Sequence, residues 1–276
     1  MSKPISSPRV RMIGIDVDGT LVGSSGVVAP VVWHAAHAAR ARGIRLVLCS
    51  GRPAFGVTMD YAHEFDPDGW HVFQNGASIV HRQTRESLSS PLPPVAVAEL
   101  IDQARASARV LELYSDNDYV TESASRWARE HAALLGVPFE PRPFESVRGV
   151  IVRAQWLVDA AGAKAVTASA PEGLEIAQSS SPLMPDTQFV GLTRAGVSKG
   201  AALETVAEKY AISLREAMYV GDSGNDLAAL RIVGLPVAMA NADETVRAAA
   251  TRIADHVDAD GLAEVLQWAA DQQAPV

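Results

Sequence analysis

Short apolar runs alternate with segments of helical periodicity near the N-terminus. The run 12–15 (MIGI) predicts a buried strand, and 44–49 predicts a second strand that contains one arginine. Between them we expect a helix that begins at Pro30, because proline suits the first helical turn, and that ends at Gly43. A strand, a helix and a strand in this order indicate a parallel sheet that is covered on both faces.

The same alternation returns near the C-terminus. The expected elements, in order, are a helix over 198–210, a strand over 217–220, a helix over 226–233 and a strand over 236–239. Ser198 suits the N-cap of the first helix. Asn241, followed by Glu244, resembles a capping box before another helix. A last amphipathic helix would place one apolar face inward, formed by Leu262, Val265, Leu266 and Ala269.

The middle of the chain has a different character. From about residue 84 to residue 187, aromatic residues and arginines are more frequent and prolines interrupt the pattern. Strands are expected over 110–114, 149–153 and 174–177, and helices over 94–106, 123–135 and 160–169. We therefore expect an α/β fold: a Rossmann-like, doubly wound parallel-sheet core formed by 1–83 and 188–276, with a second α/β domain, 84–187, inserted into it.

Composition is that of a soluble globular protein. The chain has 276 residues, of which 48% are hydrophobic and 20% charged, enough to bury a sizeable core. A formal net charge of −8 argues against binding the phosphate backbone of nucleic acids, which requires a basic face. The negative net charge does not exclude a small phosphorylated substrate, because a few local cations and a metal ion suffice to bind one phosphate group.

Other sequence features bear on the cellular location of the protein and on the roles open to its cysteine. The sole cysteine, Cys49, excludes a disulfide framework and a thiolate metal cluster, and its place at the end of a strand predicts a small buried side chain. No apolar run approaches the ~20 residues of a membrane span, and the N-terminus lacks the apolar core of a signal peptide. We therefore expect a cytoplasmic monomer or homodimer without a membrane or nucleic-acid partner.

Four polar clusters occur where apolar strands end. They are Asp16 and Asp18 in DVDGTLV, the tripeptide Ser50-Gly51-Arg52, Lys199 in GVSKG, and GDSGND at 221–226. Ligands of parallel α/β sheets bind at the carboxyl ends of the strands, so these clusters can converge. Each cluster also has a purely structural interpretation: Asp-Gly is a turn signal, a serine can cap a helix, and a lone lysine is usually solvated.

The acidic residues suit a magnesium ion. Asp16 and Asp18 would face the same side of a strand and repel each other, unless a cation or a reaction uses both charges. Asp16 and Asp222 offer the oxygen ligands that Mg²⁺ prefers, and the backbone carbonyl of Asp18 can add another. A metal ion of this kind commonly shares its coordination shell with a phosphate.

The remaining clusters suit a phosphate. Ser50 and the backbone N–H groups around Gly51 can hold phosphate oxygens. Lys199 can offset the charge of a phosphate that lies beside several carboxylates. In such a site one aspartate can attack phosphorus while its neighbour moves protons.

With these motifs the chain resembles the haloacid dehalogenase-like (HAD) hydrolase superfamily over nearly its whole length. The resemblance rests on DVDGTLV, SGR at 50–52, GVSKG at 196–200 and GDSGND at 221–226. The segments QNGA (74–77) and AMANA (238–242) resemble supporting motifs of Cof-type phosphatases, although Ala240 replaces a usual glycine. The long interval between Ser50 and Lys199 matches the Cof-type, or IIB, arrangement, in which the inserted domain is a cap that selects the substrate.

The resemblance implies a role for each matching residue. Asp16 would be the nucleophile that becomes an aspartyl-phosphate, and Asp18 would be the general acid and then the general base. Mg²⁺ would be bound by Asp16, the carbonyl of Asp18 and Asp222. The phosphate-binding residues would be Ser50, Gly51, Lys199 and Asn225, and the supporting residues would be Thr20, Arg52, Asn75 and Asp226.

The expected function is that of a Mg²⁺-dependent phosphatase that hydrolyses a small phosphate monoester. A sugar phosphate, a phosphorylated vitamin and another metabolite all fit as the substrate. A phosphotransferase or mutase would share the aspartyl-phosphate and stays an alternative, as does a non-catalytic small-molecule-binding module. A dehalogenase is disfavoured by Asp18, because a departing halide needs no general acid.

Overall fold

The computed structural model describes residues 9–181 and 184–273, so most of the N-terminal segment that lacks a signal-peptide pattern lies outside the described residues. The chain divides into two compact units. The first unit comprises Met1–Gly51, Asp60–Glu86 and Ser198–Val276, and the second comprises Arg52–Met59 and Ser87–Val197. These bounds differ from the expected insertion 84–187, whose end falls inside a strand and which leaves out the segment 52–59.

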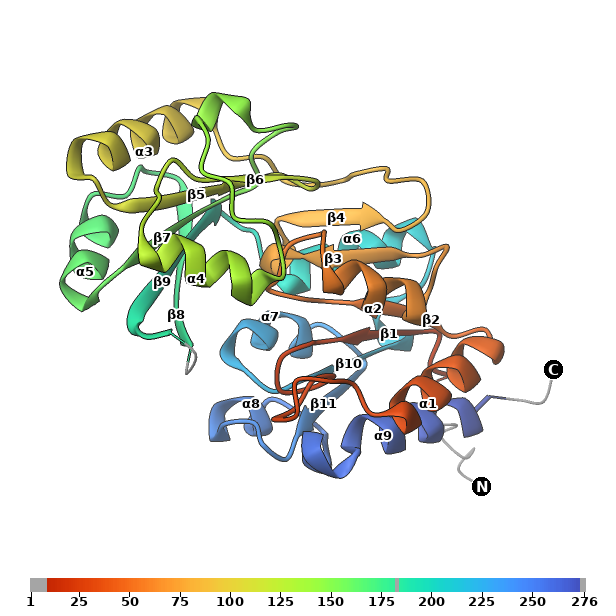
Figure 1. The fold of residues 1–276 in the computed structure, drawn as a ribbon. Coiled ribbons are helices and arrows are strands. Elements are labelled where there is room, and N and C mark those ends of the chain that lie inside the picture. Colours follow the sequence, from red (N-terminus) through yellow and green to blue (C-terminus); the bar gives the residue numbers. More distant parts are fainter. Residues whose placement is uncertain (1–8, 182–183, 274–276) are drawn as a thin grey trace, which may run out of the picture. The chain divides into compact units, whose positions relative to one another are not determined.

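A five-stranded parallel sheet forms the centre of the first unit (Figure 1). Its strands lie in the order β12-β11-β10-β1-β2. They are β1 (Met12–Ile15), β2 (Arg45–Leu48), β10 (Ala217–Gly221), β11 (Leu235–Met239) and β12 (Arg252–Ala254). In the register, Gly14 of β1 lies between Val47 of β2 and Tyr219 of β10. The sheet order confirms the expected doubly wound α/β core.

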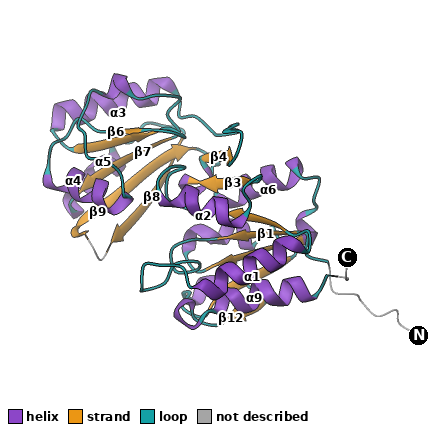
Figure 2. Ribbon diagram, turned by 45° about the vertical axis from the view of Figure 1, so that its right-hand side comes forward, coloured by secondary structure: helices purple, strands orange, loops and turns teal. Residues whose placement is uncertain are grey.

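Helices cover this sheet on both sides. They are α1 (Pro30–Ala41), α6 (Lys199–Lys209), α7 (Leu227–Leu230), α8 (Glu244–Ala248) and α9 (Gly261–Asp271). Helices α1 and α9 pack side by side, as Figure 2 shows, and α6 packs against α7. Pro30 opens α1 and Ser198 caps α6 as expected, and the apolar face expected for α9 is buried.

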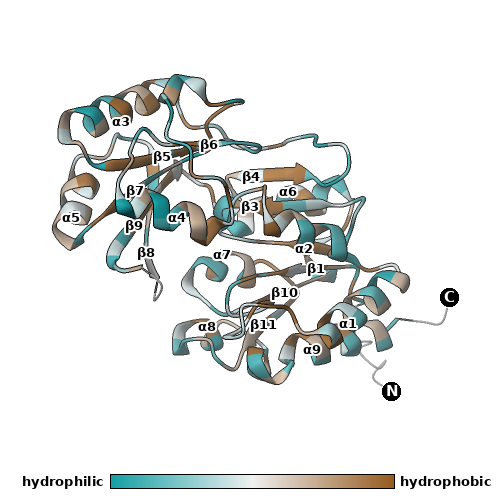
Figure 3. Ribbon diagram, viewed as in Figure 1, coloured by the Kyte–Doolittle hydropathy of each residue, from teal (hydrophilic) through white to brown (hydrophobic). Residues whose placement is uncertain are grey.

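A short hairpin completes the first unit. Strands β3 (Trp70–Phe73) and β4 (Ser78–His81) pair antiparallel and are joined by a 3-10 turn, Gln74–Gly76. Helix α2 (Val57–Phe65) precedes the hairpin and begins in the segment that belongs to the second unit. The sequence patterns did not predict these elements. Hydrophobic residues are concentrated on the strands of this unit (Figure 3), and none of the helices in the described ranges is long and apolar enough to cross a membrane.

The second unit contains a separate five-stranded antiparallel sheet in the order β6-β5-β7-β9-β8. Its strands are β5 (Val110–Tyr114), β6 (Tyr119–Val120), β7 (Arg153–Val158), β8 (Leu174–Ser181) and β9 (Met184–Arg194). Its helices are α3 (Pro94–Ser107), α4 (Arg126–Leu135) and α5 (Ala160–Ala168). Leu100 of α3 and Val166 of α5 share a buried apolar cluster with Trp156 of β7.

Some expected elements are displaced. The strand expected over 149–153 is instead β7, Arg153–Val158, and strand β9 was not expected. The helix expected over 226–233 is a 3-10 turn, Gly224–Asp226, followed by the short α7. The expected capping box at Asn241 is also wrong, because Asp243 is the N-cap of α8 and accepts from Val246 N.

Candidate active site

The carboxyl ends of neighbouring strands bring the polar clusters of the first unit together. Asp16 follows β1, Ser50 follows β2, and Asp222 follows β10. The chain leaves β1 towards β2 on one side, whereas β10 pairs with the other edge of β1, so the winding reverses between β1 and β10. Such a reversal is where α/β sheets bind ligands. The side chains of Asp16, Asp222 and Asp226 meet here, with ligand atoms within 4.8 Å of one another.

Lys199 stands at the centre of this cluster. Its Nζ lies 2.5 Å from Oδ1 of Asp16 and 2.8 Å from Oδ1 of Asp226, and it donates to Oδ1 of Asn225 at 3.3 Å. The lysine is buried, as are Asp16 and Asp226. Its position at the first residue of α6 follows from the Ser198 N-cap. The sequence-predicted lysine therefore joins the motif after β1 to the motif after β10.

The buried charges shift one another's pKa. Burial raises the pKa of the Asp16 carboxyl well above its usual value, and the charge of Asp226 adds to this, while Lys199 acts in the opposite direction. For Lys199 burial alone would lower the pKa, but the carboxylates of Asp16 and Asp226 outweigh it and hold the pKa above its ordinary value. A raised pKa favours the charged form of Lys199 beside Asp16.

Asp226 already has a full set of hydrogen-bond donors. Its Oδ1 accepts from Lys199 Nζ and, at 2.6 Å, from the hydroxyl of Tyr219. Its Oδ2 accepts from the backbone N–H groups of Asp222 and Ser223, each at 3.0 Å, and from the Ser223 hydroxyl at 3.4 Å. A carboxylate that is held by five donors is fixed in orientation and has little capacity left for a metal ion. Asp226 thus acts as an internal anchor of the cluster.

Asp222 is held by the loop that carries the first motif. The hydroxyl of Thr20 donates to Asp222 Oδ1 at 3.0 Å. Burial raises the pKa of the Asp222 carboxyl; the Thr20 hydrogen bond acts against this shift, and the charge of Asp226 adds to it. Gly19 has a left-handed φ of +86°, and a Cβ on it would lie 2.2 Å from Asp222 Oδ2. A side chain at this position would therefore displace Asp222.

The donor set fits a hard divalent cation. Asp16 and Asp222 present carboxylate oxygens at neighbouring strand ends, and no sulfur or imidazole ligand joins them among the groups found in the described residues. Oxygen-only sites of this kind suit Mg²⁺. Because Asp226 accepts from five donors, we regard Asp16 and Asp222 as the carboxylates that can hold the ion.

The loop after β1 is held by hydrogen bonds within its own backbone and by Asn241, which we had expected to cap a helix. Leu21 N and Val22 N both donate to the carbonyl of Val17, and Gly19 N donates to Val22 O. Asn241 Nδ2 donates to Gly19 O at 2.8 Å, next to Asp18, whose side chain is exposed. Asn241 belongs to the AMANA motif, so this motif could have pointed to a residue that positions the loop.

Ser50 and Asn75 belong to a second set of linked loops. Ser50 is fully buried, and its carbonyl accepts from Asn75 N at 3.0 Å. Gln74 and Asn75 both have left-handed φ, of 52° and 57°, which costs energy for residues other than glycine. Through this turn, Asn75 Oδ1 accepts from Asn225 Nδ2 at 3.0 Å. Asn225 in turn accepts from Lys199 Nζ, so one residue links Asn75 to the lysine.

Two other residues singled out in the sequence are Arg52 and Cys49. Arg52 is the first residue of the segment Arg52–Met59 and belongs to the second unit, whereas Gly51 belongs to the first. Cys49 is fully buried, and burial raises the pKa of its thiol. Its expected role as a small buried side chain is confirmed.

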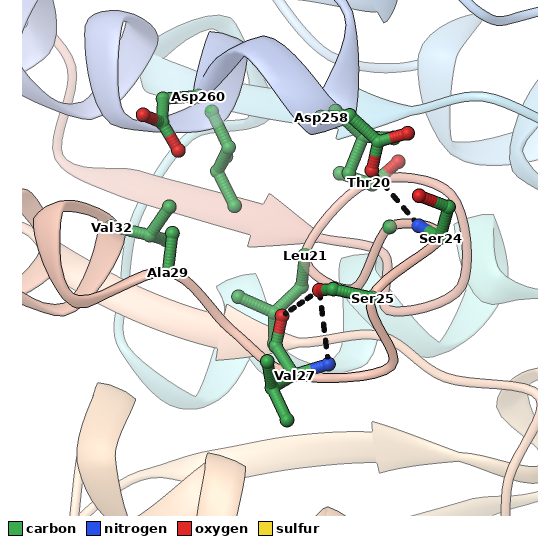
Figure 4. Close-up of a pocket in the computed structure, with 12 residues that line it drawn as sticks. Thr20, Leu21, Ser24, Ser25, Val27, Ala29, Val32, Asp258 and Asp260 are labelled. Atoms are coloured by element: carbon green, nitrogen blue, oxygen red, sulfur yellow. Dashed lines mark hydrogen bonds between the residues drawn. The ribbon is translucent and has the colours of Figure 1, made fainter.

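A pocket lies behind the loop after β1 (Figure 4). It has a volume of about 200 Å³, and Thr20 and Leu21 line one side, with Asp258 and Asp260 on another. Ser24 N donates to Asp258 Oδ1 at 2.8 Å, which fixes the loop against the segment before α9. The pocket therefore adjoins Thr20, on the side of the loop that leads to α1.

Comparisons with known proteins agree with this geometry. The chain matches the model of the haloacid dehalogenase-like hydrolases over residues 13–266. The Bacillus subtilis protein YxeH is 28% identical over 247 residues, which cover 87% of this chain and 91% of that protein. The pyridoxal phosphate phosphatase YbhA of Escherichia coli is 27% identical over 278 residues, covering 93% of this chain and 97% of that protein.

A comparison with solved structures agrees with the family match. The structure of a HAD subclass IIB sugar phosphatase matches with a TM-score of 0.78 and 23% identity, and the match covers 94% of this chain and 98% of the other. At this level of identity the likeness establishes a shared fold. Together with the family match over residues 13–266, it shows that the chain belongs to the haloacid dehalogenase-like hydrolase family and has the fold of its subclass IIB.

Proposed function

We propose that the protein is a Mg²⁺-dependent phosphatase that hydrolyses a small phosphate monoester through an aspartyl-phosphate on Asp16. The observation that carries the proposal is the buried contact of 2.5 Å between Lys199 Nζ and Asp16 Oδ1 at the end of β1. This contact places a fixed positive charge beside a carboxylate, as a nucleophile that meets a phosphate dianion requires. The relative YbhA, which is named as a phosphatase, supports the reaction class.

In the first half of the proposed reaction, a carboxylate oxygen of Asp16 forms a bond to phosphorus while the bond from phosphorus to the leaving oxygen breaks. Asp18 gives its proton to that oxygen, and the alcohol departs. In the second half, Asp18 takes a proton from water, which attacks phosphorus and releases phosphate and the Asp16 carboxylate. The exposed side chain of Asp18, on a loop held by Asn241, is suited to exchange protons with the substrate and with water.

The other residues of the site hold the phosphoryl group and the metal ion. Lys199, Ser50, Gly51 and Asn225 are proposed to bind phosphoryl oxygens; Lys199 contacts Asp16 and donates to Asn225, which supports this assignment for these two residues. Asp16, the carbonyl of Asp18 and Asp222 would hold Mg²⁺, which offsets phosphate charge when bound. Thr20, Asn75 and Asp226 then support this arrangement.

The second unit is proposed to be the cap that selects the substrate. It has its own sheet and its own apolar core, so it can hold a binding surface independently of the first unit. The segment Arg52–Met59 belongs to it and directly follows Ser50 and Gly51 in the chain. Arg52 would then contribute to the substrate from the cap.

The test measures phosphate release from a panel of sugar phosphates, pyridoxal phosphate and flavin mononucleotide, with Mg²⁺ and with a chelator. We compare the native chain with Asp16→Asn and with Asp102→Asn, an exposed residue of α3 that serves as the matched control. Activity should need Mg²⁺, survive in the control and fall by at least about 10³-fold in Asp16→Asn. Full activity of Asp16→Asn in a pure preparation would refute the mechanism.

A second assay separates hydrolysis from transfer. The substrate is supplied together with unphosphorylated sugars, and the products are followed by ³¹P NMR. A phosphatase passes the phosphoryl group to water and yields inorganic phosphate, whereas a phosphotransferase or mutase yields a new phosphate ester. Formation of a new ester as the main product would replace the proposed hydrolysis with the alternative.

A further inference from the structure

Tyr219 is a buried tyrosine that none of the sequence motifs includes. It lies on β10, and its side chain is fully buried. Its hydroxyl donates to Asp226 Oδ1 at 2.6 Å. The same oxygen accepts from Lys199 Nζ at 2.8 Å, so the phenol and the ammonium group meet at one atom.

The neighbouring strand is adapted to the ring of Tyr219. Gly14 of β1 lies opposite Tyr219 in the parallel register. A Cβ on Gly14 would lie 2.7 Å from Cδ2 of Tyr219 and 3.0 Å from Cδ1 of Leu203. Real Cβ atoms do not approach other atoms so closely, so glycine at this position is what leaves space for the aromatic ring beneath the site.

The hydroxyl completes the set of donors that fixes Asp226. The backbone N–H groups of Asp222 and Ser223 and the Ser223 hydroxyl donate to Oδ2, whereas Tyr219 and Lys199 donate to Oδ1. Without the phenol, Lys199 would be the main donor to Oδ1, and the carboxylate would draw the lysine towards itself. Because Lys199 Nζ also lies 2.5 Å from Asp16, any shift towards Asp226 lengthens the contact with Asp16.

We propose that Tyr219 is a positioning residue for the proposed phosphoryl transfer: its hydroxyl holds Asp226 so that Lys199 stays directed at Asp16. The inference rests on the proposed function, because it gives Asp16 and Lys199 their parts in the reaction. A phenylalanine would fill the same space and pack equally well against Gly14. The hydroxyl therefore has its effect through Asp226 and not through packing.

The test compares Tyr219→Phe with Tyr210→Phe. Tyr210 is the matched control, because it lies in the same unit and its hydroxyl accepts one hydrogen bond, from Trp70 N at 2.8 Å, remote from Lys199 in the hydrogen-bond network. Turnover of para-nitrophenyl phosphate with Mg²⁺ is measured below the melting temperature of each variant and is normalised to the folded fraction. We expect kcat of Tyr219→Phe to fall about tenfold or more with KM changed less than about threefold.

A merely structural role predicts a different result. Tyr219→Phe and Tyr210→Phe would then lower the melting temperature by similar amounts, and both would keep the native kcat per folded molecule. That outcome would overturn the proposal. If Tyr219→Phe does not fold, Asp226→Asn decides, because it keeps the shape of the side chain and removes the carboxylate to which Tyr219 and Lys199 both donate; an unchanged kcat in that variant would overturn the proposal as well.

Failure of this inference differs from failure of the proposed function. If Asp16→Asn abolishes activity and Tyr219→Phe retains the native kcat, only the positioning role of Tyr219 falls. If Asp16→Asn is fully active, the aspartyl-phosphate mechanism falls, whatever Tyr219→Phe shows. Loss of kcat in both variants, with Tyr210→Phe unaffected, supports both proposals.

Discussion

The hydroxyl of Thr20 donates to Oδ1 of Asp222 at 3.0 Å and so joins the loop after β1 to the loop after β10. Thr20 is buried, and the hydrogen bond opposes the burial that raises the pKa of Asp222. The bond favours the ionised carboxylate, which is the form that binds a metal ion. Thr20 would thereby act on the proposed metal site without being one of its proposed ligands.

Replacing Thr20 by valine keeps the shape of the side chain and removes the donor. We expect Thr20→Val to raise the Mg²⁺ concentration needed for half-maximal activity by about tenfold, the usual scale for loss of a residue that orients a ligand. The activity is measured across a Mg²⁺ titration. Thr205→Val, which loses a hydrogen bond to Ala201 O within α6, is the matched control and should titrate as the native protein does. Equal titrations of both variants would contradict this role.

Gly19 and Gly26 offer a direct test of the crowding around Asp222. Both have left-handed φ, of +86° and +73°, but a Cβ on Gly19 would meet Asp222 whereas a Cβ on Gly26 would meet nothing within 4 Å. Each alanine substitution should cost about 1 to 2 kcal/mol of backbone strain. Only Gly19→Ala should also lose most activity, by about 10²-fold, because it displaces Asp222. Chemical unfolding and turnover separate the two effects, and similar turnover in both variants would show that the close approach does not matter.

The convergence of Asp16, Ser50 and Asp222 at one edge of the sheet was predictable because their motifs follow strands. Residues such as Asp16, Ser50 and Asp222 stand at strand ends in the sequence, and parallel pairing then brings those ends together. Tyr219 was not predictable in this way, because its hydroxyl acts from the interior of a strand and its pattern is that of an ordinary core residue. Asn241 was assigned to a cap because its three-dimensional partner, Gly19 O, is far away in the sequence.

The sheet of the second unit was harder to predict because its strands bury polar side chains. Glu112 on β5 and Gln155 on β7 are both buried, and Glu112 Oε2 lies 2.8 Å from Nδ1 of His131 on α4. The hydroxyl of Tyr114 donates to the same carboxylate at 2.5 Å. A strand whose polar positions face a buried network lacks the usual alternation of apolar and polar residues. The sequence pattern therefore predicted a strand over 149–153, whereas the observed strand is Arg153–Val158.

Removing the charge of Lys199 should affect both activity and stability. Lys199→Met leaves the buried carboxylates of Asp16 and Asp226 without their cation, which typically costs about 3 to 5 kcal/mol at neutral pH. Activity should fall by about 10²-fold or more, since the phosphoryl group loses its positive partner. Urea unfolding and turnover measure the two effects.

The cost of Lys199→Met should also depend on pH. The pKa of Asp16 is already raised, first by burial and then by Asp226, and loss of the lysine raises it further. As the pH falls from neutral to acid, protonation of Asp16 in the variant removes the repulsion from Asp226, so the loss of stability should become smaller. Lys164→Met, at an exposed position of α5, is the control and should cost little at either pH. A pH-independent loss in Lys199→Met would contradict the repulsion.

The pH dependence of folding should also reflect His71, a buried residue of β3. Its Nδ1 accepts from Leu48 N at 3.0 Å, and its Nε2 lies 2.9 Å from Asp66 O, so the neutral ring carries its proton on Nε2. Burial lowers the pKa of His71 from 6.5 to about 4, with the Asp66 hydrogen bond acting in the opposite direction. A proton on Nδ1 would face the N–H of Leu48 and break their hydrogen bond.

His71 should therefore stabilise the fold above its unfolded pKa and lose this effect in acid. As the pH falls, the unfolded chain protonates near 6.5 but the folded chain does so only near 4, so the unfolded state binds the extra proton in this window. Between about pH 7.5 and pH 4.5 the native protein should lose about 2 to 3 kcal/mol of unfolding free energy that His71→Gln does not lose. Urea unfolding over this range measures the difference, with His34→Gln, at an exposed position of α1, behaving as the native chain does. Parallel losses in the native protein and His71→Gln would show that this ring does not set the acid limit of the fold.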